Sequence, residues 1–314
     1  MLSMRWIAGL ACSVGLLGAT GFGNPRDWND TLQAGLVQHY AGHFAEAEVL
    51  LRSAITESRR EGKTIETAET LNHLGDVYLS EDRLADAEDT FREALALYKQ
   101  SGSPEIGAVV ALRSLGTALS LEGRQDKAIS ILNDALRQAK TNFPSNDKLA
   151  PEILNSLGMA YTQRRNFKKA EALFLEVVRI KSSAGGNDFA TANALNNLAQ
   201  IHREQRKYAE AEPVLKTAIE VNPKFFPVRN ILGRSYLGLE RYDDAFRTYE
   251  EAVPLASEAD RKQLAGLFGF GGVGDGYMNA GRPKDALRAY ERALQLDPGN
   301  PELANKIAAA RAKL

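Results

Sequence analysis

One alanine recurs at nearly even spacing along almost the whole chain, and this recurrence constrains the fold more than any other feature. The seven copies are Ala47, Ala87, Ala128, Ala170, Ala211, Ala245 and Ala286. Twelve residues before each of them lies a second small residue, namely Gly35, Gly75, Gly116, Gly158, Ala199, Gly233 and Gly274. Small side chains at facing positions allow two helices to approach closely. Each copy therefore predicts a hairpin of two helices.

Large apolar residues accompany both small positions at helical spacing. A leucine precedes the first small residue in most copies, and a tyrosine often follows it by three, which places both on one helical stripe. On the second helix a large residue lies four positions after the alanine: Leu51, Phe91, Leu132, Phe174, Leu215, Tyr249 and Tyr290. We expect these large residues to face the next repeat. The copies then stack in one dimension and bury a continuous core.

The second copy shows the pattern in full, with the run Leu71–Tyr78 followed by Ala87, Phe91 and Ala94. This pattern resembles the tetratricopeptide repeat, in units that start near residues 28, 68, 109, 151, 192, 226 and 267. Most units exceed the family's basic length and are similar to those of kinesin light chain and its bacterial relatives. The resemblance implies an all-α, right-handed α-solenoid of helix-turn-helix repeats over residues 28–300, with a C-terminal capping helix at 301–314.

The N-terminus differs in character from the repeats. Met1–Arg5 carries one positive charge, and the uncharged stretch that follows it, up to Pro25, is rich in glycine and other small residues. This composition is typical of a secretory signal and too weakly apolar for a permanent membrane span. We expect a signal peptide at residues 1–23 and an exported protein, periplasmic or extracellular. An uncleaved N-terminal anchor and a lipid-modified Cys12 remain alternatives.

Composition argues against several classes of partner. The chain has 39 Lys and Arg against 40 Asp and Glu, so no global field attracts nucleic acid or an anionic membrane. We therefore expect no nucleic-acid partner and no stable membrane insertion after signal cleavage. Because the single cysteine lies in the leader, the body can form neither a disulfide nor a thiolate metal site.

Two patterns resemble chemical sites, and neither has the context that such a site needs. His39 and His43 have a metal-binding spacing, but Gly42 between them falls where the hairpin turn should begin, so we expect no metal. Residues 269–274 satisfy G-x-G-x-x-G, yet a dinucleotide site needs a preceding strand, and the repeat register predicts a frayed or bent helix here. With no catalytic constellation in view, we expect neither a cofactor nor an enzyme.

Polar residues on the first helices are the candidates for a binding site, because those helices line the inner face of such a solenoid. Asparagine occupies one equivalent position in four units, and its amide can both donate to and accept from a peptide main chain. In kinesin light chain the matching asparagines contact cargo peptides, and the resemblance implies the same here. The candidate groove consists of Asn72, Asp76, Arg113, Asn155, Met159, Asn196, Gln200, Arg203, Asn230 and Arg234.

The alternative is that these asparagines are surface residues copied when the repeat duplicated. The pattern favours a non-catalytic scaffold or adaptor that binds a protein or extended peptide segment in its concave groove. A second hypothesis is a regulatory or substrate-docking subunit of an extracytoplasmic enzyme, secretion or envelope-assembly complex.

Overall fold

The computed structural model describes residues 27–102, 104–146, 148–183 and 189–314, and these residues form helices and turns with no strand. The expected all-α fold of consecutive helical hairpins is therefore confirmed. The predicted signal peptide and Cys12 lie outside the described residues. Within the described part, no helix is long and apolar enough to cross a membrane. The chain divides into two compact units, one ending at Asn166 and the other beginning at Phe167.

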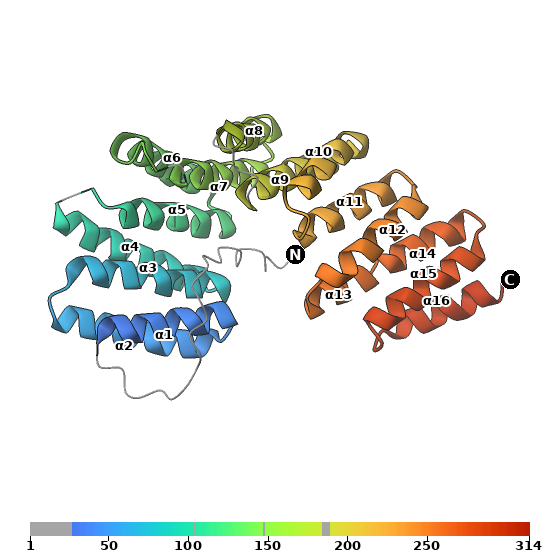
Figure 1. Cartoon of the computed structure of the whole chain (residues 1–314), viewed down its shortest axis with the longest axis horizontal. Coiled ribbons are helices and arrows are strands. Elements are labelled where there is room, and N and C mark those ends of the chain that lie inside the picture. The colour runs from blue at the N-terminus through green and yellow to red at the C-terminus, as the bar shows by residue number, and fades with distance from the viewer. Residues whose placement is uncertain (1–26, 103, 147, 184–188) are drawn as a thin grey trace. The chain divides into compact units, whose positions relative to one another are not determined.

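The first unit contains helices that pack side by side in chain order, coloured blue to green in Figure 1. Short turns join the helices of each hairpin. In order, they are α1 (Trp28–Ala41), α2 (Phe44–Arg60), α3 (Thr64–Ser80), α4 (Leu84–Ser101), α5 (Ile106–Leu121), α6 (Gln125–Asn142) and α7 (Leu149–Gln163).

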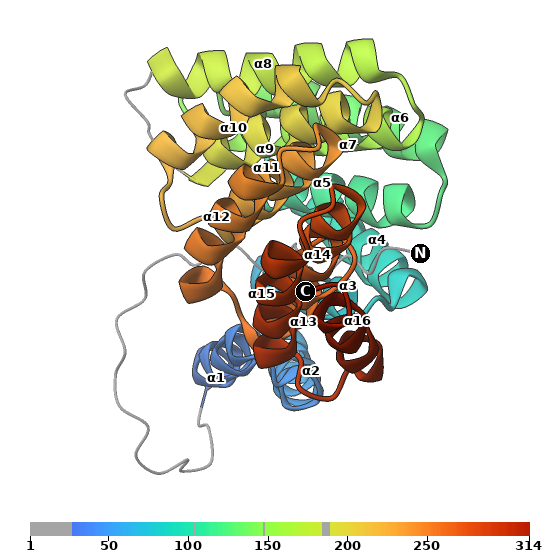
Figure 2. The ribbon, with the colours of Figure 1, turned by 90° about the vertical axis from the view of Figure 1, so that its right-hand side faces the viewer.

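The second unit continues this pattern and adds one irregular segment. Its helices are α8 (Phe167–Ser183), α9 (Phe189–Glu204), α10 (Tyr208–Val221), α11 (Phe226–Gly238), α12 (Tyr242–Ala252), the short 3-10 helix η1 (Val253–Leu255), α13 (Glu258–Ala265), α14 (Phe270–Asn279), α15 (Pro283–Leu296) and α16 (Pro301–Arg311). Figure 2 shows α13, α15 and α16 at the C-terminal end of this unit. Helix α16 packs on α15 and buries Leu303, Ile307 and Ala310.

Five of the hairpins have a glycine on the first helix that lies against a large side chain on the second, which lets the two helices approach closely. A Cβ carbon added to Gly75 would lie 2.5 Å from the ring of Phe91, and one added to Gly233 would lie 2.3 Å from the ring of Tyr249. The same pairing joins Gly35 to Leu51, Gly116 to Leu132 and Gly274 to Tyr290. The sequence pattern predicts that these large residues face the next repeat. These contacts place them against the first helix of their own hairpin as well, and the ring of Tyr249 also meets that of Phe270 on the next hairpin, with centroids 5.7 Å apart.

The turn inside each hairpin contains one residue with positive φ, five positions before the recurring alanine. Glycine occupies it in the first, third and seventh hairpins, at Gly42, Gly123 and Gly281. The other hairpins hold Asp82, Arg165, Arg206 and Glu240 there, with φ of 61°, 59°, 59° and 57°. A non-glycine residue in this left-handed region pays a steric penalty, which the surrounding helix packing offsets.

Successive hairpins are joined on their outer side by an arginine, an acid and a tyrosine. Arg83 Nη1 donates to Glu48 Oε2 at 2.6 Å, Tyr78 Oη donates to Glu48 Oε1 at 2.8 Å, and the Arg83 guanidinium lies 4.2 Å from the centre of the Tyr78 ring. The set recurs as Arg241, Glu212 and Tyr236, and as Arg282, Asp243 and Tyr277. Glu48 and Glu212, each beside a recurring alanine, are half-buried and join consecutive repeats.

Helix α13 lies between two hairpins, after α12, and has no counterpart between the other hairpins described. Ser257 and Asp260 form a capping box at its start, in which each side chain bonds the other's backbone N–H. Glycines then bring the chain close to this helix: a Cβ carbon at Gly269 would lie 1.9 Å from the Leu264 carbonyl oxygen. The G-x-G-x-x-G stretch therefore follows a helix and runs into α14, which begins at Phe270. Gly269, Gly271 and Gly272 allow a close backbone crossing, whereas Gly274 lies against the Tyr290 ring.

Candidate functional site

First helices of neighbouring hairpins contact one another in both units, so they form a continuous inner face within each. The contacting pairs are α1 with α3, α3 with α5 and α5 with α7 in the first unit, and α9 with α11 and α11 with α14 in the second. All ten candidate groove residues lie on these helices. The first unit carries Asn72, Asp76, Arg113, Asn155 and Met159, and the second carries Asn196, Gln200, Arg203, Asn230 and Arg234.

Three of the four asparagines are buried, with exposed fractions of 6% for Asn72, 7% for Asn196 and 6% for Asn230. Asn72 Nδ2 donates to the Gly107 carbonyl oxygen at 2.9 Å, at the start of the next first helix. Asn230 Nδ2 donates to Gln263 Oε1 at 2.9 Å, on α13. These two amides therefore hold neighbouring helices together with their NH₂ groups, a role that the sequence pattern does not reveal.

Buried polar atoms without a hydrogen-bond partner concentrate on the first helices. Within the part of the chain that the structure describes, every such side-chain atom belongs to α3, α5, α9 or α11. They are Oδ1 of Asn72 and Asn196, Nδ1 of His202, and Nε of Arg113, Arg203, Arg229 and Arg234. Five of these seven residues belong to the candidate groove, whereas His202 and Arg229 were not predicted as groove residues. A buried unpaired group costs about 1–3 kcal/mol, so its concentration on one face demands an explanation.

In the first unit, an acid and a base share this face between α3 and α5. Burial raises the pKa of the Asp76 carboxyl, and the charges of Arg113 and His39 only partly offset that effect. Ser114 Oγ donates to Asp76 Oδ1 at 3.4 Å. Arg113 Nε lies 3.7 Å from Glu152 Oε2 on α7, too far for a hydrogen bond. The inner face of this unit therefore carries both signs of charge.

In the second unit, the first helices carry two arginines, Arg203 on α9 and Arg234 on α11. Burial and the like charge of Arg203 lower the pKa of the Arg234 guanidinium. Arg234 also lies 4.7 Å from the centre of the Phe268 ring, in the turn that connects α13 to α14. The ring of Phe268 is 57% exposed and its neighbour Leu267 is 64% exposed. Cationic and apolar groups thus lie together on this face.

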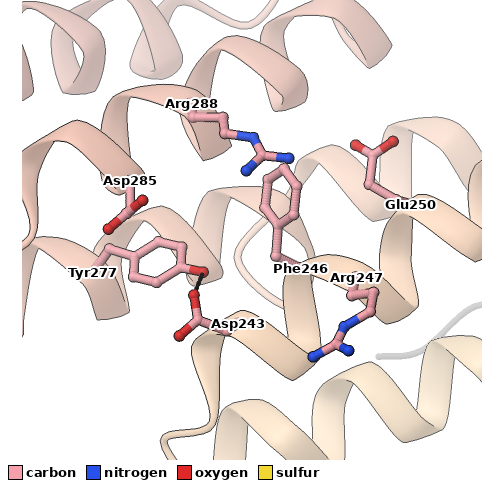
Figure 3. Close-up of a pocket in the computed structure, with 7 residues that line it drawn as sticks. All are labelled: Asp243, Phe246, Arg247, Glu250, Tyr277, Asp285 and Arg288. Carbon is pink, nitrogen blue, oxygen red and sulfur yellow. Dashed lines mark hydrogen bonds between the residues drawn. The ribbon is translucent and has the colours of Figure 1, made fainter.

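A cavity of about 400 Å³ lies on a different face, between α12, α14 and α15. Figure 3 shows Tyr277 Oη donating to Asp243, at 2.7 Å, with Arg288 over the ring of Phe246. Arg282 also binds Asp243, which makes this carboxylate part of the joint between hairpins. Among the described residues there is no group of three or more His, Cys, Asp or Glu that could hold a metal ion.

Profiles of the tetratricopeptide repeat match residues 30–100, 66–141 and 149–224, then 196–260, and finally 270–300. The chain therefore belongs to the tetratricopeptide repeat family. A TPR repeat-containing protein of Dictyostelium discoideum is 30% identical over 146 residues, which is 46% of this chain. The chain spans only 9% of the length of that relative.

Solved structures show the same fold. A tetratricopeptide repeat protein from Parabacteroides merdae has a TM-score of 0.53 at 15% identity, covering 90% of this chain and 98% of that one. A Rap protein complexed with Competence and Sporulation Factor has a TM-score of 0.59 at 16% identity, covering 89% and 76%. Putative kinesin light chain repeats from Podospora anserina have a TM-score of 0.52 at 14% identity, covering 62% and 94%. At these identities the likeness concerns the fold alone.

Proposed function

We propose that this protein is a non-catalytic adaptor that holds an extended segment of another protein against the inner face of its first helices. The observation that carries the proposal is the concentration of unpaired buried polar atoms on α3, α5, α9 and α11. Folding alone gains nothing from a desolvated group that has no partner. A bound segment would supply those partners once the side chains rotate to expose these atoms.

The chemistry of these atoms suits a peptide main chain. Oδ1 of Asn72 and Oδ1 of Asn196 are acceptors, and a backbone N–H is the donor that an extended peptide offers at regular intervals. The arginine Nε atoms are donors for carbonyl or carboxylate oxygens. Because the Nδ2 group of Asn72 is already engaged with Gly107, this asparagine would bind through its oxygen alone. The Rap protein, of the same fold, is solved with a bound factor, which supports a binding role.

Site-specific photo-crosslinking in cells that express the protein tests the proposal. A benzophenone amino acid replaces Met159 or Gln200, both half-buried on first helices. Matched controls replace Arg137 or Lys216, which are exposed on second helices. We expect a discrete protein adduct from the inner positions and none from the outer ones. Adducts that form equally on both faces, or on neither, contradict the proposal.

We also propose that the protein acts after export, on the strength of the uncharged, small-residue leader. Cell fractionation followed by mass spectrometry of the N-terminus tests this. Cleavage near Gly21 supports a released protein, an intact leader supports a membrane anchor, and a lipid on Cys12 supports a lipoprotein. Recovery of the uncleaved, unmodified chain in the cytosol contradicts export.

A further inference from the structure

The cavity between α12, α14 and α15 lies at a joint between hairpins that differs from three other joints. In those three, the residue directly after the recurring alanine is a glutamate that accepts from an arginine of the next hairpin: Glu48 from Arg83, Glu88 from Arg124 and Glu212 from Arg241. The equivalent residue of the sixth hairpin is Phe246, and this joint uses Asp243, which accepts from Arg282 and Tyr277. An aromatic ring thus replaces a carboxylate at this position, and it lines the cavity of about 400 Å³.

Each acid in the lining is bound by an arginine from outside the lining. Arg282 donates to Asp243 at 2.8 and 2.9 Å and to Asp285 Oδ2 at 2.7 Å. Arg292 donates to Glu250 at 2.7 Å. Asp243 and Asp285 therefore share one guanidinium, which leaves one negative charge in excess on their side of the cavity. Among the described residues, no group donates to the second carboxylate oxygen of Asp285, so this oxygen can accept a further hydrogen bond.

The two arginines in the lining differ in their partners. Arg247 Nη2 donates to Asp244 Oδ1 at 2.8 Å. Arg288 lies 4.4 Å from the centre of the Phe246 ring and forms no hydrogen bond or ion pair with any residue that the structure describes. A guanidinium that stacks on a ring through one face keeps the N–H groups at its edge available as donors. Figure 3 shows Asp243 and Asp285 around Tyr277, to one side of Arg288. The cavity therefore has an unpaired positive group beside a region of excess negative charge.

We propose that this cavity binds a small zwitterionic molecule of the amino-acid class, with its carboxylate on Arg288 and its ammonium group on Asp285. A guanidinium binds a carboxylate through charge-assisted, paired hydrogen bonds. An ammonium group supplies donors to the open Asp285 oxygen and offsets the charge that Asp243 and Asp285 share. The volume of about 400 Å³ lies within the range of small-molecule sites.

Charge balance favours a zwitterion over a simple anion or cation. The lining residues and their ion-pair partners carry equal numbers of carboxylates and guanidinium groups. A simple carboxylate would satisfy Arg288 and add repulsion from Asp243 and Asp285, whereas a simple amine would leave Arg288 unpaired. This site lies away from the inner face of the first helices, so the inference goes beyond the proposed adaptor function and is independent of it.

Isothermal titration of the purified full chain with each of the twenty common amino acids tests the proposal. The site variant is Arg288→Gln, and Arg179→Gln removes the same charge from an exposed position on α8 as a control. We expect wild type and control to bind at least one amino acid, and the site variant to bind it at least roughly tenfold more weakly. Because Arg288 is exposed, its replacement should leave the protein folded, which helical circular dichroism checks.

Derivatives of the bound amino acid assign its two charged groups. The methyl ester lacks the carboxylate, so it should bind wild type and Arg288→Gln equally weakly. The N-acetyl derivative lacks the ammonium group and should bind wild type at least roughly tenfold more weakly than the free amino acid. Binding of no amino acid, or equal binding by wild type and Arg288→Gln, overturns the site. An N-acetyl derivative that binds as tightly as the free amino acid overturns the zwitterionic ligand.

Discussion

The ring of Phe91 lies directly against Gly75, so that a Cβ carbon added to the glycine would lie 2.5 Å from the ring atom Cε1. Real Cβ contacts are not this short, and both helices are fixed by neighbouring repeats. We expect Gly75→Ala to lower the free energy of unfolding by about 2–3 kcal/mol. Urea denaturation followed by circular dichroism measures the change.

A second substitution tests the cause. The fifth repeat pairs Ala199 with Leu215 at the equivalent positions, and both are fully buried. Gly75→Ala/Phe91→Leu copies that pair and should recover part of the loss. Gly299, whose added Cβ would meet nothing within 4 Å, provides the control as Gly299→Ala. A double variant no more stable than Gly75→Ala would show that the ring is not the obstacle.

The joint between the first two hairpins should depend on pH. Partial burial raises the pKa of Glu48, but hydrogen bonds from Arg83, Tyr78 and Arg52 outweigh it and lower the pKa to about 2. An unfolded glutamate titrates near pH ~4.3, so this stabilisation is complete above roughly pH 5 and is lost as the pH falls toward 2. At pH 7, Glu48→Gln should cost about 1 kcal/mol.

The gap in thermal midpoint between wild type and Glu48→Gln should therefore shrink from pH 6 to pH 2.5. The exposed neighbour Glu46 serves as the control, since Glu46→Gln removes the same charge without touching the joint. If the difference in thermal midpoint stays constant over this pH range, the charge of Glu48 does not stabilise the joint.

Buried Asn72 should contribute to stability whether or not it binds a partner. Its Nδ2 donates to the Gly107 carbonyl oxygen across the junction between α3 and α5. Asn72→Ala removes that bond and leaves a small cavity, so we expect a loss of about 1–2 kcal/mol in denaturant unfolding. Asn305→Ala, on an exposed position of α16, should change little. Equal stability of the two variants would show that the Gly107 bond contributes nothing.

The turn residue Glu240 adopts φ of 57°, where glycine is favoured and other residues are strained. Glu240→Gly should raise the free energy of unfolding by about 0.5 kcal/mol, because relief of strain exceeds the added freedom of the unfolded chain. The equivalent turn residue of the third hairpin is Gly123, and Gly123→Ala should lose about 1 kcal/mol. The two substitutions lie at equivalent backbone positions and should change the free energy of unfolding in opposite directions. Thermal unfolding of both variants measures this, and changes of the same sign would contradict the prediction.

Local patterns predict the hairpins, because the small and large residues of one repeat contact each other at fixed sequence spacing. Gly75 and Phe91 illustrate this. Their residue types predict that both positions are packed, and the structure shows that they contact each other. Contacts between repeats are less visible. The Asn230 amide finds its partner on α13, a helix that breaks the repeat pattern, and only the capping sequence Ser257–Asp260 marks its start.

The spatial relationship between Arg203 and Arg234 is harder to predict from the sequence. Arg203 and Arg234 both belong to the groove predicted on the first helices, but their relative placement depends on how α9 packs against α11. Glu212, Glu250 and Asp275 each accept a hydrogen bond from another basic residue, Arg241, Arg292 and Lys306 respectively. Contacts between side chains of different repeats leave no pattern within the sequence of a single repeat.

The pair also yields the last prediction, which concerns stability in the unbound protein. Burial and repulsion from Arg203 disfavour the charged form of Arg234, so its neutral replacement removes an unfavourable interaction. Arg234→Gln should leave the thermal midpoint unchanged or raise it by a few degrees. Arg282→Gln provides the matched comparison, because Arg282 donates two hydrogen bonds to Asp243, and its loss should lower the midpoint by roughly 2 °C. Scanning calorimetry without ligand measures both. A residue that weakens the free protein is one that the fold does not need, so a large destabilisation by Arg234→Gln would instead assign Arg234 to the fold.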